Sequence, residues 1–243
     1  MYLSKLTINV YSRDFRRDHA DIRQMHRTIM AGYPHLPETT AARQAQAILW
    51  RLDSIHRGFV QYIQSSTKPD WSRLPADYLT EPPQVRSLQP LLDAITPGQR
   101  FAFRLVGNPT RTVVRPANRN HPLPENGKRP RGIRIARRKP EEQIEWLIRK
   151  GDQHGFVVPT AQNGHPDVSP SPCLDASGRA RPGDKGPITI EPVRFEGHLV
   201  VTDAEAFRTA VQRGIGHGKA YGCGLVSLAR PGSAASSSPR PPR

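Results

Sequence analysis

Hydrophobic residues at the start of the chain recur first at every second position and then at every third or fourth. Over residues 2–10 they alternate with polar residues, which predicts a half-buried strand. Between residues 22 and 29 they follow helical spacing, which predicts an amphipathic helix that Asp18 or Asp21 could cap. A basic turn separates the two elements, and the helix should end near Gly32.

Two further strand candidates follow, over residues 47–52 and 59–63, and Gly58 marks the turn of a hairpin between them. Residues 80–90 are rich in proline, so we expect a first domain to end near residue 92. Up to this point the order of elements is strand, helix, strand, strand.

The second half of the chain begins again with a strand, over residues 99–106, in which apolar side chains share one face. After an irregular basic loop, residues 132–136 form a short strand candidate. Pro140 suits the first turn of a helix, and Gly151 is expected to end that helix.

Residues 159–187 hold many Pro, Gly, Ser and Asp residues, which favours a long flexible loop between strands. Residues 188–201 then favour a hairpin that turns at Glu196 and Gly197. The loop and the hairpin together lead to the last helix of the chain.

Thr202 and Glu205 form a capping box for that helix, and Gly214 is its natural C-cap. The order of elements in each half is compatible with a β-α-β-β-α-β ferredoxin-like unit, which is an α+β architecture. We therefore expect two tandem domains, over residues 1–92 and 93–229. Residues 230–243 should form a disordered tail, because Ser, Pro and Arg dominate them.

The charge of the chain favours a polyanionic partner. Its 243 residues include 36 Lys and Arg against 21 Asp and Glu, a net charge of +15. Nucleic acid is the first candidate for such a field, and a merely soluble basic surface is the alternative. The absence of an 18-residue apolar run and of a leader pattern predicts a cytoplasmic protein without a membrane contact.

Metal-ligand patterns are missing from the sequence. Cys173 and Cys223 lie far apart, and the nine histidines do not form a ligand motif with a supporting carboxylate. Acidic residues do not cluster as a two-metal nuclease would require. We expect two reduced thiols, no metal and no cofactor.

A glycine-rich segment near the C-terminus is the strongest candidate for phosphate binding. Closely spaced glycines remove side chains and expose backbone N–H groups, which can hold phosphate. The spacing fits neither a Walker A loop nor a dinucleotide fingerprint, and the segment follows a helix. The residues expected to bind are Gly214, Gly216, His217, Gly218 and Lys219.

A run of seven cations within twelve residues is the second candidate. We expect it to contact phosphates, although a solvated face is the common alternative for such runs. Its members are Lys128, Arg129, Arg131, Arg134, Arg137, Arg138 and Lys139.

His26 is the best single catalytic candidate. It lies beside the apolar stripe of the first helix, where a core histidine is the ordinary interpretation. Arg23 and Arg27 would draw a phosphodiester to the same edge, where an imidazole can transfer protons near neutral pH. His217 is the competing candidate, with an exposed loop position as its alternative.

Several segments resemble the CRISPR-associated CasE endoribonucleases of type I-E systems. The resemblance covers nearly the whole chain to Arg230, and the glycine-rich segment is its most specific part. The segments are residues 1–6, 25–27, 103–105, 108–109, 142–147, 195–197 and 214–229.

The resemblance implies two tandem ferredoxin-like domains and an enzyme that cuts CRISPR repeat RNA at the base of a hairpin. It also implies that the protein is a monomer when free, and that it stays on the crRNA 3′ hairpin beside other Cascade subunits. His26 matches the family's catalytic histidine, which promotes metal-free attack by the RNA 2′-hydroxyl; Arg23 stands where some relatives have tyrosine. A non-catalytic RNA-hairpin-binding subunit and a generic basic protein remain as alternatives.

Overall fold

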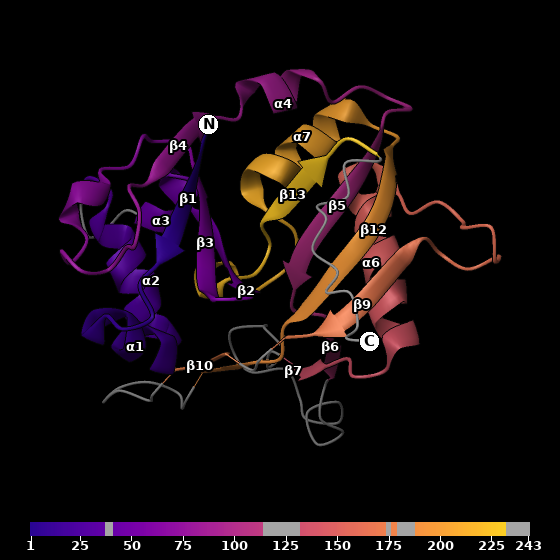
Figure 1. Ribbon diagram of the computed structural model, residues 1–243. Coiled ribbons are helices and arrows are strands. Elements are labelled where there is room, and N and C mark those ends of the chain that lie inside the picture. The colour runs from indigo at the N-terminus through magenta and orange to yellow at the C-terminus, as the bar shows by residue number, and fades with distance from the viewer. Residues whose placement is uncertain (37–40, 114–131, 174–175, 179–187, 232–243) are drawn as a thin grey trace, which may run out of the picture.

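The computed structural model describes residues 1–36, 41–113, 132–173, 176–178 and 188–231. Two larger antiparallel sheets, each with helices packed on one face, form most of the described structure (Figure 1), and two smaller two-stranded sheets accompany them. This part of the chain contains no helix that is long and apolar enough to cross a membrane.

The first sheet has the strand order β2-β3-β1-β4, and every neighbouring pair in it is antiparallel. Its core is formed by the apolar side chains of these strands and of helices α1 and α2. The elements of this half are β1 (Tyr2–Ile8), α1 (Arg13–Ala20), α2 (Ile22–Ala31), α3 (Ala42–Ala45), β2 (Leu49–Ile55), β3 (Gly58–Ser65), the 3₁₀ turn η1 (Trp71–Arg73), β4 (Gln84–Ser87) and α4 (Gln89–Asp93).

The second sheet has the order β13-β5-β12-β8, and β9 also pairs with β12. Helices α6 and α7 cover one face of this sheet and supply its core. The elements are β5 (Arg100–Gly107), β6 (Thr110–Val113), β7 (Ile133–Ala136), α6 (Pro140–His154), β8 (Phe156–Val157), β9 (Val168–Pro172), β10 (Ala176–Gly178), β11 (Ile188–Ile190), β12 (Val193–Val201), α7 (Ala204–Arg213), η2 (Lys219–Tyr221) and β13 (Val226–Ala229).

Each sheet has the strand order of a ferredoxin-like domain, so the expected α+β class with two such units is confirmed. The first unit departs from the pattern because η1 and coil replace the second helix. Leu92 of α4 packs into the second core, together with Ile95. The domain boundary at 92–93 stays a proposal. The disorder expected for the tail also stays a prediction, because most of the tail (232–243) lies outside the described residues.

Several expectations for the first half were wrong. The basic segment after β1 is helix α1, because Ser12 caps it by accepting a hydrogen bond from the Phe15 N–H and Phe15 is buried. The proline-rich segment contains strand β4, which pairs with β1 through backbone groups that a side-chain pattern does not reveal.

Two glycines in the second half were misread as breaks. Helix α6 runs past Gly151 to His154. Residue 151 is glycine because a side chain there would collide with the Phe156 carbonyl. Gly155, in the left-handed region at φ 73°, ends the helix. Strand β12 likewise runs straight through Gly197, where the Asp167 backbone approaches too closely for any side chain. The hairpin expected over 188–201 is therefore absent from the described structure.

Two smaller corrections concern the same half. The segment expected as a loop over 159–187 contains strands β9 and β10 among its described residues. The cap of α7 is Asp203 instead of Thr202, because the Asp203 carboxylate accepts hydrogen bonds from the N–H groups of Glu205 and Ala206, at 2.9 and 3.0 Å.

An ionic chain, buried at Arg51 and Asp53 and partly exposed at Arg104 and Glu196, joins the two sheets. Arg51 of β2 donates to both oxygens of Asp53, at 2.7 and 3.1 Å, and to the hydroxyl of Ser227 in β13 at 3.0 Å. Arg104 of β5 bridges Asp53, at 3.0 Å, and Glu196 of β12. These contacts hold the domains against each other along β2.

Candidate active site

His26 lies in the middle of α2, a helix that begins where the Asp21 carboxylate accepts a hydrogen bond from the Arg23 N–H. Its ring is partly buried, and within the described residues Nδ1 has no hydrogen-bond partner. Burial, and then the nearby Arg43 guanidinium, lower the pKa of His26 to about 4. The imidazole is therefore neutral at pH 7 and has a nitrogen free to accept a proton.

The glycine-rich segment folds against this helix. Helix α2 packs on η2, and the Trp50 indole donates a hydrogen bond to the Ala220 carbonyl at 3.2 Å. Lys219, the first residue of η2, donates to the Arg213 carbonyl at 2.8 Å. Burial, and then Arg43, lower the pKa of Lys219. The structure thus brings His26, Lys219 and Arg43 into one electrostatic neighbourhood.

Arg43 is a site residue that the sequence analysis missed. It lies on α3, and its guanidinium donates a hydrogen bond at 3.1 Å to the carbonyl of Ile48, the residue just before β2. Burial lowers its own pKa. No motif in the sequence marks it, because only the fold brings it close enough to His26 to lower the pKa of that imidazole.

The two arginines expected beside His26 lie in different surroundings. Arg23 is partly buried, and its side chain packs beside Gly178 of β10. Arg27 is exposed and donates to Gln24 at 3.0 Å. Arg23 is therefore part of the interface between α2 and the second domain, whereas Arg27 faces outward.

The glycine-rich segment is a tight loop with five glycines in the left-handed region. Gly214 caps α7 as expected, and backbone carbonyls accept hydrogen bonds from the N–H groups of Gly214, Ile215 and Gly224. Among the described residues, no backbone carbonyl accepts from Gly216, His217 or Gly218. The loop glycines with positive φ are Gly214, Gly216, Gly218, Gly222 and Gly224.

His217 is exposed at the tip of this loop. Burial, followed by Arg134, Lys150 and Lys219, lowers its pKa, so strand β7 and helix α6 bring their cations to the loop. Arg134 therefore lies near the glycine loop, although the two belong to separate segments of the sequence. Three cations, Arg134, Lys150 and Lys219, thus lie near the loop, whose N–H groups at 216–218 lack backbone acceptors among the described residues.

The rest of the basic run is only partly described. Arg138 forms two hydrogen bonds with the Glu191 carboxylate, both at 2.8 Å, and Arg137 lies 3.8 Å from Glu145. Lys139 is the N-cap residue of α6 and is exposed. The predicted contacts Lys128, Arg129 and Arg131 lie outside the described residues.

Within the described ranges, no three side chains of His, Cys, Asp or Glu gather as metal ligands would. The site offers an imidazole, the Arg43 guanidinium near it, Lys219 near Arg43 and a loop of backbone donors. This set can move a proton and stabilise negative charge on a phosphorus centre.

Comparisons with known proteins agree with this chemistry. A family model described as CRISPR associated protein matches residues 1–230. The CRISPR-associated endoribonuclease Cse3 of Thermus thermophilus is 34% identical over 234 residues, 94% of this chain and 100% of that protein. The Cascade subunit CasE of Escherichia coli is 30% identical over 231 residues, with 94% and 99% covered.

A solved structure of the CRISPR endoribonuclease Cse3 bound to a 19-nucleotide RNA is similar throughout, with a TM-score of 0.74 and 32% sequence identity. The match covers 94% of this chain and 100% of that chain. By the family model, by sequence identity over nearly its full length and by fold, the chain belongs to the CRISPR-associated proteins that include Cse3 and CasE.

Proposed function

We propose that the protein is a metal-independent endoribonuclease that cleaves CRISPR repeat hairpins in precursor crRNA. The observation that carries the proposal is the neutral imidazole of His26, with Nδ1 unpaired among the described residues and with the Arg43 guanidinium close by. The relatives named an endoribonuclease and a Cascade subunit support it.

The reaction starts from the RNA's own 2′-hydroxyl. Its oxygen forms a bond to the adjacent phosphorus, the bond from phosphorus to the 5′-oxygen breaks, and a 2′,3′-cyclic phosphate and a 5′-hydroxyl result. At pH 7 the His26 ring is neutral, which is the state that can take the 2′-hydroxyl proton, and the 5′-oxygen gains a proton as it leaves. DNA lacks this nucleophile.

Two groups of cations have separate roles in this proposal. Arg43, close to His26, and Lys219, close to Arg43, would offset the charge that develops on the pentacoordinate phosphorus. Arg134 and the exposed N–H groups of the glycine loop would hold phosphates of the hairpin. Arg23, Arg27 and the remaining predicted cations would extend this contact.

We also propose that the protein stays on the 3′ hairpin of the mature crRNA as a Cascade subunit, is a monomer before assembly and acts in the cytoplasm. The net charge of +15 supports tight retention of RNA. The RNA-bound Cse3 structure and the Cascade name of CasE support the two partners.

Cleavage of the host's repeat RNA in EDTA tests the proposal. Wild-type protein should cut one site, while His26→Ala or a single 2′-deoxy nucleotide before the scissile phosphate should block cutting and spare binding. Tight binding without cutting would instead favour a non-catalytic hairpin-binding subunit. Cutting that survives His26→Ala would move the chemistry to His217.

A further inference from the structure

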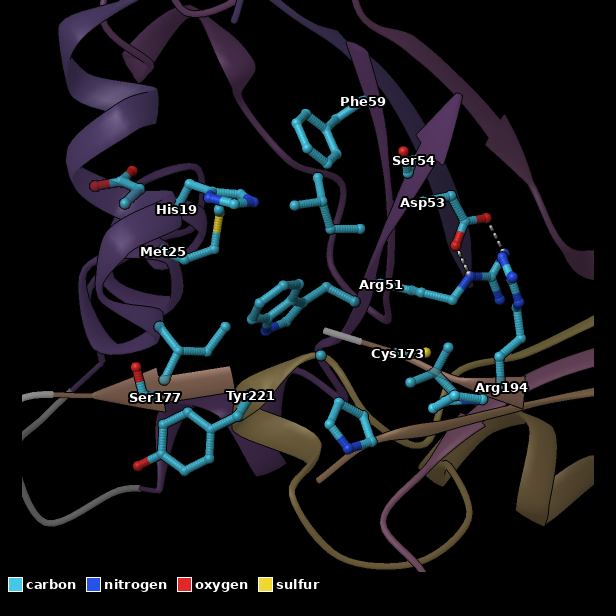
Figure 2. A pocket seen from close by; sticks show the side chains of 18 residues that line it. His19, Met25, Arg51, Asp53, Ser54, Phe59, Cys173, Ser177, Arg194 and Tyr221 are labelled. Atoms are coloured by element: carbon cyan, nitrogen blue, oxygen red, sulfur yellow. Dashed lines mark hydrogen bonds and ion pairs between the residues drawn. The ribbon is translucent and has the colours of Figure 1, made fainter. Parts of the chain in front are cut away.

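A pocket of about 400 Å³ opens beside the catalytic helix, between the two domains (Figure 2). Helices α1 and α2 and strand β2 of the first domain form one side of it, and β10, β12 and η2 of the second domain form the other. Its size falls in the range of roughly 300–1,000 Å³ that small-molecule sites occupy. The phosphate chemistry proposed above does not use this space.

The pocket is adjacent to His26. Ile22 lines it, and His26 follows Ile22 by one turn on the same side of α2, about 6 Å along the helix. Tyr221 lines it from the end of η2, the short helix that begins with Lys219. A nucleotide whose phosphate lies at His26 therefore has a neighbouring base within reach of the pocket.

Flat aromatic and apolar side chains form most of the walls. Met25, Phe59 and Tyr221 line the pocket (Figure 2), and so does Trp50, which is buried. At the mouth, the exposed ring of His19 leans on Phe59, with 5.1 Å between the ring centroids. Rings of this kind are the surfaces on which unpaired bases stack.

The lining also contains charged groups. Arg194 of β12 is one of them, and its Nε is buried without a hydrogen-bond acceptor among the described residues. Glu196 lies 3.6 Å from this nitrogen, beyond hydrogen-bond distance. Asp53, also in the lining, is already bonded to Arg51 and Arg104, so its charge is balanced.

These walls match one ligand chemistry. A purine has a wide ring for the aromatic side and an acceptor at N7, joined in guanine by O6, which an arginine donor recognises. A bare phosphate would leave the aromatic walls unused, and an aliphatic ligand would leave Arg194 unsatisfied.

We propose that this pocket binds an unpaired purine base, and that the base belongs to a nucleotide flanking the scissile phosphate. This inference rests on the proposed endoribonuclease function. Seating the base fixes its ribose and phosphate beside His26, which aligns the attacking oxygen with the bond that breaks. A free purine nucleotide has the same chemistry and is the alternative source of the base.

Photo-cross-linking tests the site directly. Repeat RNA that is made uncleavable by one 2′-deoxy nucleotide would carry 8-azidoadenosine at each unpaired position flanking the hairpin in turn. With wild-type protein, one position should label the peptides that contain Phe59 or Tyr221, as mapped by mass spectrometry. Labelling that falls elsewhere from every position would overturn the proposal.

Two matched variants sharpen the result. Ser54 is exposed and lines the pocket, so Ser54→Phe should fill it and lower the labelling at least tenfold. Ser66 is exposed just after β3 and outside the lining, so Ser66→Phe should leave labelling unchanged. Equal labelling of the two variants would contradict the assignment.

Free 8-azido-AMP separates the two sources of the base. If it labels the same peptides and repeat RNA protects them, the RNA supplies the base. If repeat RNA gives no protection, the pocket is a free-nucleotide site and the RNA assignment is wrong. Cleavage of intact repeat RNA by the wild type is scored in parallel, so a failure of the proposed nuclease function is recognised independently of the labelling.

Discussion

His26 should make the folded protein sensitive to mild acid. The unfolded chain binds a proton on this imidazole near its ordinary pKa of about 6.5, whereas the folded chain resists it until a pKa of about 4, because the ring is desolvated beside Arg43. The unfolded state therefore binds more protons between these values. Stability contributed by the neutral ring is fully present above pH 6.5 and is lost as the pH falls toward 4.

The size of the effect follows from the two pKa values. At pH 5 the shift corresponds to about 2 kcal/mol of lost stability. Part of the ring reaches solvent, so we expect about 1–2 kcal/mol after screening. Replacing the imidazole by a side chain that does not titrate should remove this pH-dependent loss.

Urea unfolding of wild type and His26→Asn at pH 7.5 and pH 5 measures this pH-dependent loss of stability. The variant should lose about 1–2 kcal/mol less than the wild type between the two pH values. His56→Asn, at an exposed position in the turn after β2, controls for the removal of one histidine. If wild type and His26→Asn lose stability in parallel, the ring is not desolvated as described, and the reasoning fails.

Three further predictions concern a buried ion pair, a close backbone contact and the charge near His26. Asp53→Asn leaves the buried Arg51 without its carboxylate, so the free energy of unfolding should fall by about 3 kcal/mol, and an unchanged urea midpoint would refute the role of this ion pair. Gly197→Ala forces a methyl group into the Asp167 backbone and should lower the melting temperature well beyond Gly164→Ala, a positive-φ control with open space around it; equal losses would contradict the close approach. Arg43→Gln should raise the pKa of His26, seen as an upward shift of the acid limb in single-turnover cleavage, and should slow cleavage on the order of tenfold; a profile identical to that of the wild type would exclude Arg43 from the site.

The sequence predicted those elements whose pattern is local. The strand at residues 2–8, helix α2 and the β2–β3 hairpin were recognisable because their apolar residues repeat at a fixed period on one face. The terminal glycine loop was recognisable because few other residues tolerate its positive φ angles.

The remaining features depend on contacts between distant segments. Gly197 has the pattern of a turn, so a break was predicted inside what is a continuous strand. The glycine is instead explained by the close approach of the Asp167 backbone, which the sequence does not reveal. Arg43 has no local signature, because only the fold brings its charge near His26. The lining of the proposed purine pocket includes residues of β2, β12 and η2, so no single segment of the sequence indicates the pocket.

The hydrogen bond from Trp50 to the Ala220 carbonyl has a consequence for the timing of synthesis. His26 leaves the ribosome before η2 and its lysine, because it precedes them in the chain. A nascent chain therefore carries the imidazole before it carries the loop that completes the site. Nuclease activity should appear only when translation has passed β13.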